Sequence, residues 1–166
     1  MTFGDPNDFA IEAYHEPPGP EWKGKGFGEL CIHLQGTPLG DIDEEHCSLF
    51  HATIRFRELA NTIDSLWDES FSGLSDAEIF ELLDRELYAD EPSENSRRYQ
   101  RFNFLTNTGK MFAQWKTFIV CAPTGRVHIL CQVRDGTSAS GSCDVRTFQA
   151  VAEAYVRWFD EHVGRP

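Results

Sequence analysis

The spacing of apolar residues changes along the chain, and this change limits the folds open to it. In residues 29–35, Leu30, Ile32 and Leu34 alternate with other residues, which predicts a strand with one buried face. In residues 57–67 and 75–88 the apolar residues recur every three or four positions, which predicts helices. Residues 127–134 return to alternation. Strands and helices therefore come in blocks, without the strict alternation that a parallel sheet needs.

Turn and cap signals add the remaining elements. Residues 9–14, 47–54, 99–106 and 111–121 are expected to be strands, the last two joined by a hairpin at 107–110. A capping-box pattern at 75–78 begins the second helix, and Asp144 can cap a last helix after a Gly- and Ser-rich loop at 135–143. We predict a single α+β domain over residues 1–166, an antiparallel sheet packed by about three helices.

The charge of the chain is strongly negative and unevenly placed. Its formal net charge is −12, with 27 Asp and Glu against 15 Lys and Arg. Most of the carboxylates lie before residue 97, whereas most of the arginines lie after it. A field of this sign repels nucleic acid and anionic membranes and favours a basic partner, although the charge could also serve solubility alone.

No targeting or membrane segment is evident in the sequence. No run of 18 apolar residues occurs, and residues 1–8 lack the basic and apolar regions of a signal peptide. We therefore expect a cytoplasmic protein whose five cysteines are reduced.

Signatures of common enzymes and cofactor sites are missing from the sequence. There is no G-x-S-x-G elbow, P-loop, H-E-x-x-H or zinc deaminase pair. Asp41, Asp43 and Glu45 have the spacing of a calcium loop, but His46 and Ala52 stand where that loop needs Gly and Glu. Without these motifs, we predict no enzyme, no catalytic residue and no cofactor.

Cysteine and histidine residues in the first third of the chain form the best candidate metal site. Sulfur and imidazole ligands suit zinc, but their spacing matches no usual zinc motif, so we predict no metal. A Cys–His nucleophile pair stays open, because such partners need not be adjacent in sequence. The candidates are Cys31, His33, His46, Cys47 and His51.

Acidic residues of the first half are the strongest candidates for contacts with a partner. Four carboxylates crowd one loop, and eleven more lie in residues 64–94, where Arg85 is the only basic residue. Such a run is expected to remain as an external field that steers a basic partner, with Trp67 or Tyr88 as an anchor. The predicted contact set is Asp41, Asp43, Glu44, Glu45, Asp64, Trp67, Asp68, Glu69, Glu81, Asp84 and Tyr88.

Three short motifs resemble a known family. The opening Gly4-Asp5-Pro6-Asn7-Asp8-Phe9-Ala10-Ile11-Glu12, the segment 22–36 and Arg126-Val127-His128-Ile129-Leu130 are similar to the immunity protein 42 family of bacterial polymorphic toxin systems. The resemblance implies a protein that binds and neutralises a cognate toxin, without catalysis. The partner of the predicted contact set would then be that toxin.

Two other functions stay open at this stage. A secretion chaperone or adaptor for an effector would also be small and acidic, and it would tend to form a dimer. An unrecognised hydrolase or metal-binding protein would use the Cys and His candidates, and bound zinc would reveal it.

Overall fold

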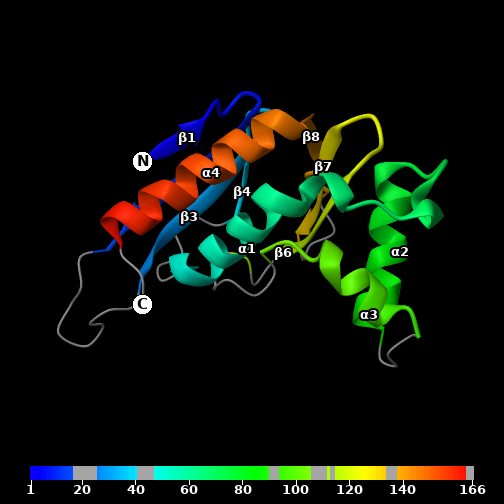
Figure 1. Ribbon diagram of the computed structural model, residues 1–166. Helices are drawn as coiled ribbons and strands as arrows, with labels where there is room; N and C mark the ends of the chain where they lie inside the picture. The colour runs from blue at the N-terminus through cyan, green and yellow to red at the C-terminus, as the bar shows by residue number, and fades with distance from the viewer. Residues whose placement is uncertain are drawn as a thin grey trace.

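Two antiparallel sheets and four helices make up the part of the chain that a computed structural model describes, which is residues 1–16, 26–40, 47–89, 94–105, 112, 115–133 and 138–163. This arrangement confirms the α+β class predicted from the sequence. The expected single sheet is two sheets, and a short fourth helix joins the three expected ones (Figure 1).

The larger sheet is built around the long antiparallel pair β2–β3. Ile11 lies opposite Ile32 in this pair, and both are buried on the face that also carries Leu30. Gly28 sits where the strands approach closely, because a Cβ there would lie 1.9 Å from the backbone oxygen of Tyr14. The strands run in the order β1–β2–β3–β4, with β5 also paired to β3. They are β1 (Thr2–Gly4), β2 (Phe9–His15), β3 (Phe27–Leu34), β4 (Thr37–Leu39) and β5 (Cys47–Ser48).

The segment after β5 is helical, which corrects two predictions. The strand expected over 47–54 ends at Ser48, whose side chain caps helix α1 (Leu49–Thr62) by accepting from the backbone N–H of His51. Leu49, Phe56 and Leu59 are buried at helical spacing, and this longer stripe outweighs the strand-like start. The helix expected over 57–67 therefore begins earlier and ends at Thr62, followed by the 3₁₀ turns η1 (Ile63–Ser65) and η2 (Glu69–Phe71).

The next helix follows its sequence signals closely. Helix α2 spans Asp76–Tyr88 and starts at the predicted capping box. The Glu78 carboxylate accepts from the Ser75 backbone N–H at 2.7 Å, and the Ser75 hydroxyl accepts from the Glu78 backbone N–H at 3.4 Å. Two orphan donors of the first turn are thereby satisfied.

The smaller sheet is a three-stranded meander, but its members differ from those expected. Its order is β6–β7–β8. The third strand, β8, comes from the predicted Gly/Ser-rich loop, whereas the described residues 99–105 contribute only an isolated bridge between Asn103 and Phe118 of β6. Tyr99 and Phe102 are both buried beside Phe71, and a spacing of three places two side chains on one face only in a helical turn. The hairpin expected at 107–110 lies outside the described residues. The elements are α3 (Ser96–Tyr99), η3 (Gln100–Phe102), β6 (Trp115–Cys121), β7 (Arg126–Val133) and β8 (Gly141–Asp144).

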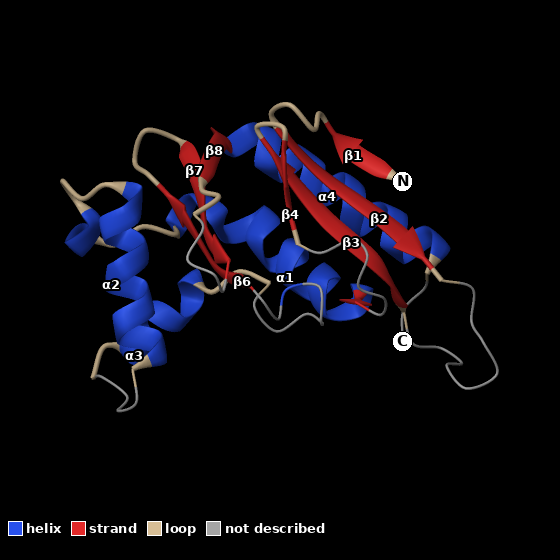
Figure 2. Ribbon diagram, turned by 180° about the vertical axis from the view of Figure 1, so that it is seen from behind, coloured by secondary structure: helices blue, strands red, loops and turns tan. Residues whose placement is uncertain are grey.

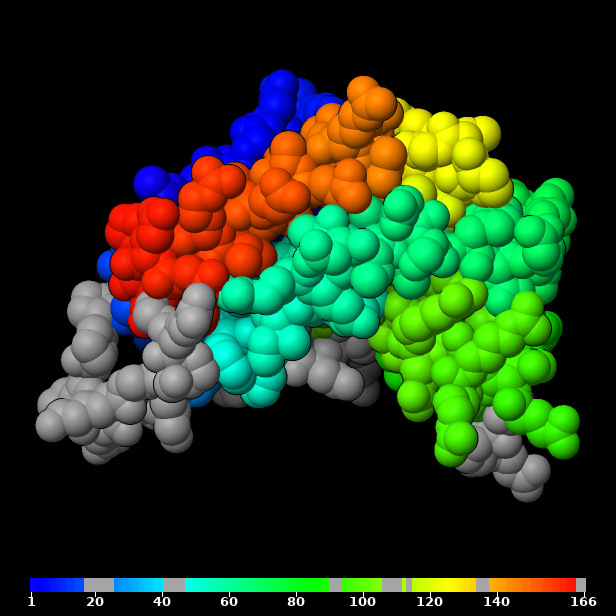
Figure 3. Space-filling view, in the orientation of Figure 1, coloured from blue at the N-terminus to red at the C-terminus, as the bar shows by residue number. Residues whose placement is uncertain are grey.

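The last helix, α4 (Val145–His162), covers one face of the larger sheet. Asp144 caps it as predicted, accepting from the backbone N–H of Arg146. Phe148 of α4 stacks on Phe9 of β2 at 5.0 Å between ring centroids. Helix α1 lies beside α4 on the same side of the sheet, and the two form much of the surface in Figure 3. The opposite face of the larger sheet is turned toward the viewer in Figure 2.

Candidate functional site

Residues of the predicted contact set from two segments, the turns after α1 and the helix α2, lie together at one end of the molecule. Asp64 and Glu69 lie on the turns η1 and η2, and Glu81 lies on the neighbouring helix α2 (Figure 1). All three side chains are exposed. The acidic loop of the set, Asp41, Asp43, Glu44 and Glu45, lies outside the described residues.

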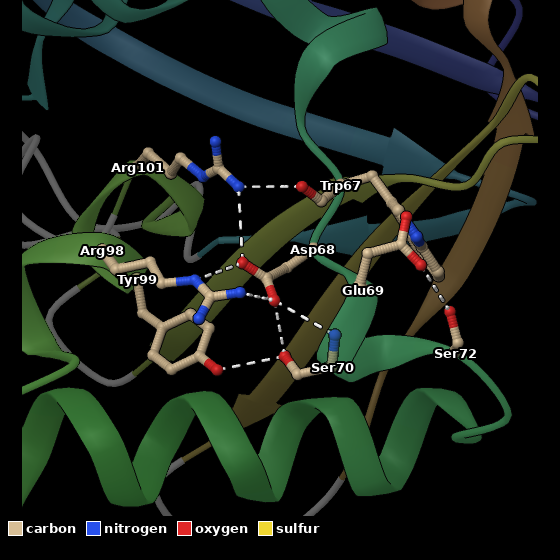
Figure 4. Close-up of polar contacts among 8 residues, drawn as sticks. All are labelled: Trp67, Asp68, Glu69, Ser70, Ser72, Arg98, Tyr99 and Arg101. Atoms are coloured by element: carbon tan, nitrogen blue, oxygen red, sulfur yellow. Dashed lines mark hydrogen bonds and ion pairs between the residues drawn. The ribbon is translucent and has the colours of Figure 1, made fainter.

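Asp68 is buried, which corrects its expected place on the surface. The residue is only 4% exposed and caps η2, where its carboxylate accepts from the backbone N–H of Ser70 at 3.1 Å and from the Ser70 hydroxyl at 2.7 Å. The Ser70 hydroxyl in turn lies 3.0 Å from the Tyr99 hydroxyl (Figure 4). A buried carboxylate costs free energy unless it is paired, and its partners come from elsewhere in the sequence.

Two arginines after residue 97 supply that pairing. Arg98 donates from Nε to Asp68 Oδ2 at 2.6 Å and from Nη2 to Asp68 Oδ1, a two-point contact. Arg101 Nη2 lies 3.6 Å from Asp68 Oδ2 and donates to the carbonyl of Trp67 at 2.8 Å (Figure 4). The network joins η2 to α3 and η3, so Asp68 positions this end of the molecule.

The pKa of the Asp68 carboxyl reflects both its burial and these hydrogen bonds and ion pairs. Burial is the largest influence and raises the pKa, but hydrogen bonds from Ser70 and from Arg98, together with the charge of Arg98, lower it further than burial raises it. The net pKa lies below the ordinary value, so Asp68 is ionised at neutral pH.

The outer side of α2 carries both paired and exposed groups. Lys116 of β6 donates to Asp84 at 2.5 Å and lies 5.1 Å from the centroid of the Tyr88 ring. The Tyr88 hydroxyl donates to Asn103 Oδ1 at 3.1 Å, while the side chain remains 42% exposed. Tyr88 is therefore held in one orientation, whereas Glu81 projects into solvent.

These pairs correct the expectation of an uncompensated acidic run between residues 64 and 94 for three of its carboxylates. Asp68, Asp76 and Asp84 meet cationic or imidazole groups from the second half, since the His128 Nδ1 lies 2.9 Å from Asp76 Oδ1. The sequence did not predict these ion pairs between distant segments, because local spacing reveals only partners within one helix. Trp67, expected as an anchor, is partly buried and packs edge-on against Phe71 at 5.6 Å.

The cysteines are placed as apolar residues. All five are buried, and burial raises the pKa of the Cys131 and Cys143 thiols to about 12. Burial, with a smaller effect from the Glu12 charge, raises the pKa of Cys31 to about 11. A thiol nucleophile needs its thiolate, which these environments disfavour at neutral pH.

The candidate metal ligands do not form a cluster within the described residues. No group of three or more His, Cys, Asp or Glu side chains there could hold a metal ion. His33 pairs instead with Glu12, at 2.8 Å between Nε2 and Oε2, and Cys47 is buried in the core. His51 is exposed on α1, and His46 lies outside the described residues.

Comparison with known proteins identifies the family. A family model described as immunity protein 42 matches residues 1–158. The chain belongs to the immunity protein 42 family. This match confirms the resemblance stated from three sequence motifs, and it makes the chain an immunity protein that neutralises a toxin. No curated protein matches the sequence.

A solved structure supports the fold of this immunity protein 42 member. The present chain is similar to the crystal structure of CdiI from Burkholderia dolosa AUO158, with a TM-score of 0.61 and 15% sequence identity. The match covers 95% of this chain and 99% of that chain. In the described part of the present chain, no helix is both long and apolar enough to cross a membrane.

Proposed function

We propose that this immunity protein neutralises its toxin by forming a stoichiometric complex, that it performs no chemistry of its own, and that the toxin is basic. The observation that carries the proposal is the family match over residues 1–158. The net charge of −12 supports a basic partner, because opposite charges speed association and favour the correct pairing.

The side chains of the described residues support a binding function over a catalytic one. The thiols are buried, and the pKa of each of Cys31, Cys131 and Cys143 is raised well above neutrality. The carboxylate with the most partners, Asp68, is inside the protein and ties two segments together. We propose that the whole chain is one domain acting in the cytoplasm of the producing cell. One continuous set of buried apolar residues, which runs from Phe9 to Phe159, supports the single domain.

Co-expression with the toxin encoded beside this gene tests the proposal. We expect rescue of growth, a one-to-one complex on purification, and an association rate that falls as salt rises because the opposing charges are screened. The rate should fall while the stoichiometry stays the same. Growth that is not rescued, with no complex formed, would overturn the proposal, and a dimer that binds an unfolded stretch of an effector would favour the chaperone function instead.

A further inference from the structure

One face of the larger sheet is left without a helix. Side chains of β2 and β3 alternate between two faces, and Phe9, Ile11 and Ile32 point into the core beneath α1 and α4. Residues of the opposite parity point to the other face, where Ala10 and Cys31 are buried and Tyr14, near the end of β2, is exposed. Figure 2 looks onto that face, and no described helix lies over it.

An aromatic side chain stands between two carboxylates on this open face. Tyr14 lies directly opposite Glu29 in the β2–β3 register, and Glu12 is two residues before Tyr14 on the same face. Tyr14, the next-to-last residue of β2, is 54% exposed. Glu12 also meets His33, so the carboxylate is held on this face by a cross-strand contact of 2.8 Å.

The open face differs from α2 in its charge balance. Described residues 1–16 and 26–40, which form β1 to β4, contain five carboxylates and no Lys or Arg. Around α2, by contrast, Arg98 and Lys116 meet Asp68 and Asp84 directly. Within the described residues, no Lys or Arg of β1 to β4 is therefore available to neutralise Glu12 and Glu29, and Glu12 is paired only with His33.

We propose that the toxin docks on this open face through a basic segment, with Tyr14 as the anchor and Glu12 and Glu29 as the charged contacts. The proposal rests on the proposed function, since it names the surface that meets the toxin. A carboxylate accepts a two-point contact from Arg, and a guanidinium also stacks on an aromatic ring. In protein interfaces, a few residues supply most of the binding free energy, and aromatic residues are common among them.

Matched charge reversals separate this surface from the general field of the protein. Glu29→Lys and Glu81→Lys change the net charge equally, but Glu81 lies on α2 at the other end of the molecule. Affinity for a catalytically inactive form of the toxin encoded beside this gene is measured by calorimetry. We expect Glu29→Lys to weaken binding at least tenfold, and Glu81→Lys less than threefold.

The aromatic anchor has its own pair of variants. Tyr14→Ala should weaken binding at least tenfold, whereas Ile54→Ala, which removes another exposed large side chain (49% exposed, on α1), should leave it unchanged. Urea midpoints of all four variants show whether each is folded.

Hydroxyl-radical footprinting tests the same surface without mutation. Tyr14 and Tyr88 are 54% and 42% exposed, so both should be oxidised in the free protein. Complex formation is expected to protect Tyr14 and to leave Tyr88 reactive. Protection of Tyr88 alone, or equal losses from Glu29→Lys and Glu81→Lys, would overturn the docking surface while binding itself stands. A wild-type chain that fails to bind would instead count against the proposed function.

Discussion

Replacing Asp68 with alanine measures how strongly the buried carboxylate holds η2 to α3. The change removes the cap of η2, which costs about 1 kcal/mol in comparable helices. It also removes the acceptor for the Ser70 hydroxyl, a loss of about 1 kcal/mol for a typical hydrogen bond. The ion pairs add little, because the Arg98 and Arg101 side chains are 54% and 45% exposed and can be solvated by water. We expect the free energy of unfolding to fall by about 2 kcal/mol.

The pH dependence of this loss has a definite sign. The pKa of Asp68 is lower in the folded protein than in the unfolded chain, where it is about 3.9. Its charge therefore stabilises the fold fully above that value, and this stabilisation disappears as the pH falls through the folded pKa. The difference between wild type and Asp68→Ala should be largest near neutral pH and should shrink in acid.

Urea unfolding at pH 7 and at pH 3 provides the measurement, with Asp68→Asn as the control. Asparagine still caps the turn, but its neutral oxygen accepts weaker hydrogen bonds from Ser70 than a carboxylate does, so its loss at pH 7 should be about half as large. A melting temperature lower by about 4–8 °C for Asp68→Ala is the matching thermal result. A loss below about 0.5 kcal/mol at pH 7, or a loss that grows in acid, would refute this account of the network.

Two further predictions concern the helix cap and the thiols. Ser75→Ala should lower the free energy of unfolding by about 1 kcal/mol in urea titrations, because it removes the cap of α2. Ser72→Ala, which lies outside the capping box, is the control and should change this free energy by almost nothing. Equal losses from the two variants would show that the cap adds nothing specific. Thiol reagents at pH 8 should label the folded protein far more slowly than the urea-unfolded chain, because all five cysteines are buried and the thiols of Cys131 and Cys143 have pKa values of about 12. Rapid labelling of either residue in the folded protein would contradict its placement in the core.

Several elements could be predicted because their signals are local. The alternation in 29–35 and 127–134 and the capping box at Ser75 each concern neighbours a few residues apart, and β3, β7 and α2 confirm them. The strand predicted over 47–54 was wrong because its signal could not be decided from a few neighbouring residues. Its apolar spacing suits either structure over a short window, and only the continued burial of Phe56 and Leu59 shows a helix.

The pairing of charges could not be predicted in the same way. Arg98 reaches Asp68 from thirty residues along the chain, and Lys116 reaches Asp84 from a strand of the smaller sheet. Nothing in the spacing of either segment indicates the other. The acidic run from 64 to 94 therefore looked uncompensated in sequence, although three of its carboxylates have partners in the fold.

By itself, the sequence determined the α+β class, the cap of α2, the strong negative charge and the motifs shared with the immunity protein 42 family. These depend on composition and on residues close together in the chain. Only the tertiary structure decided that the strands form two sheets, that Asp68 is buried between segments, and that Tyr14 is exposed on the sheet face away from α1 and α4. Each of these depends on which distant segments come into contact, because packing and electrostatic pairing act through space and carry no period in the sequence.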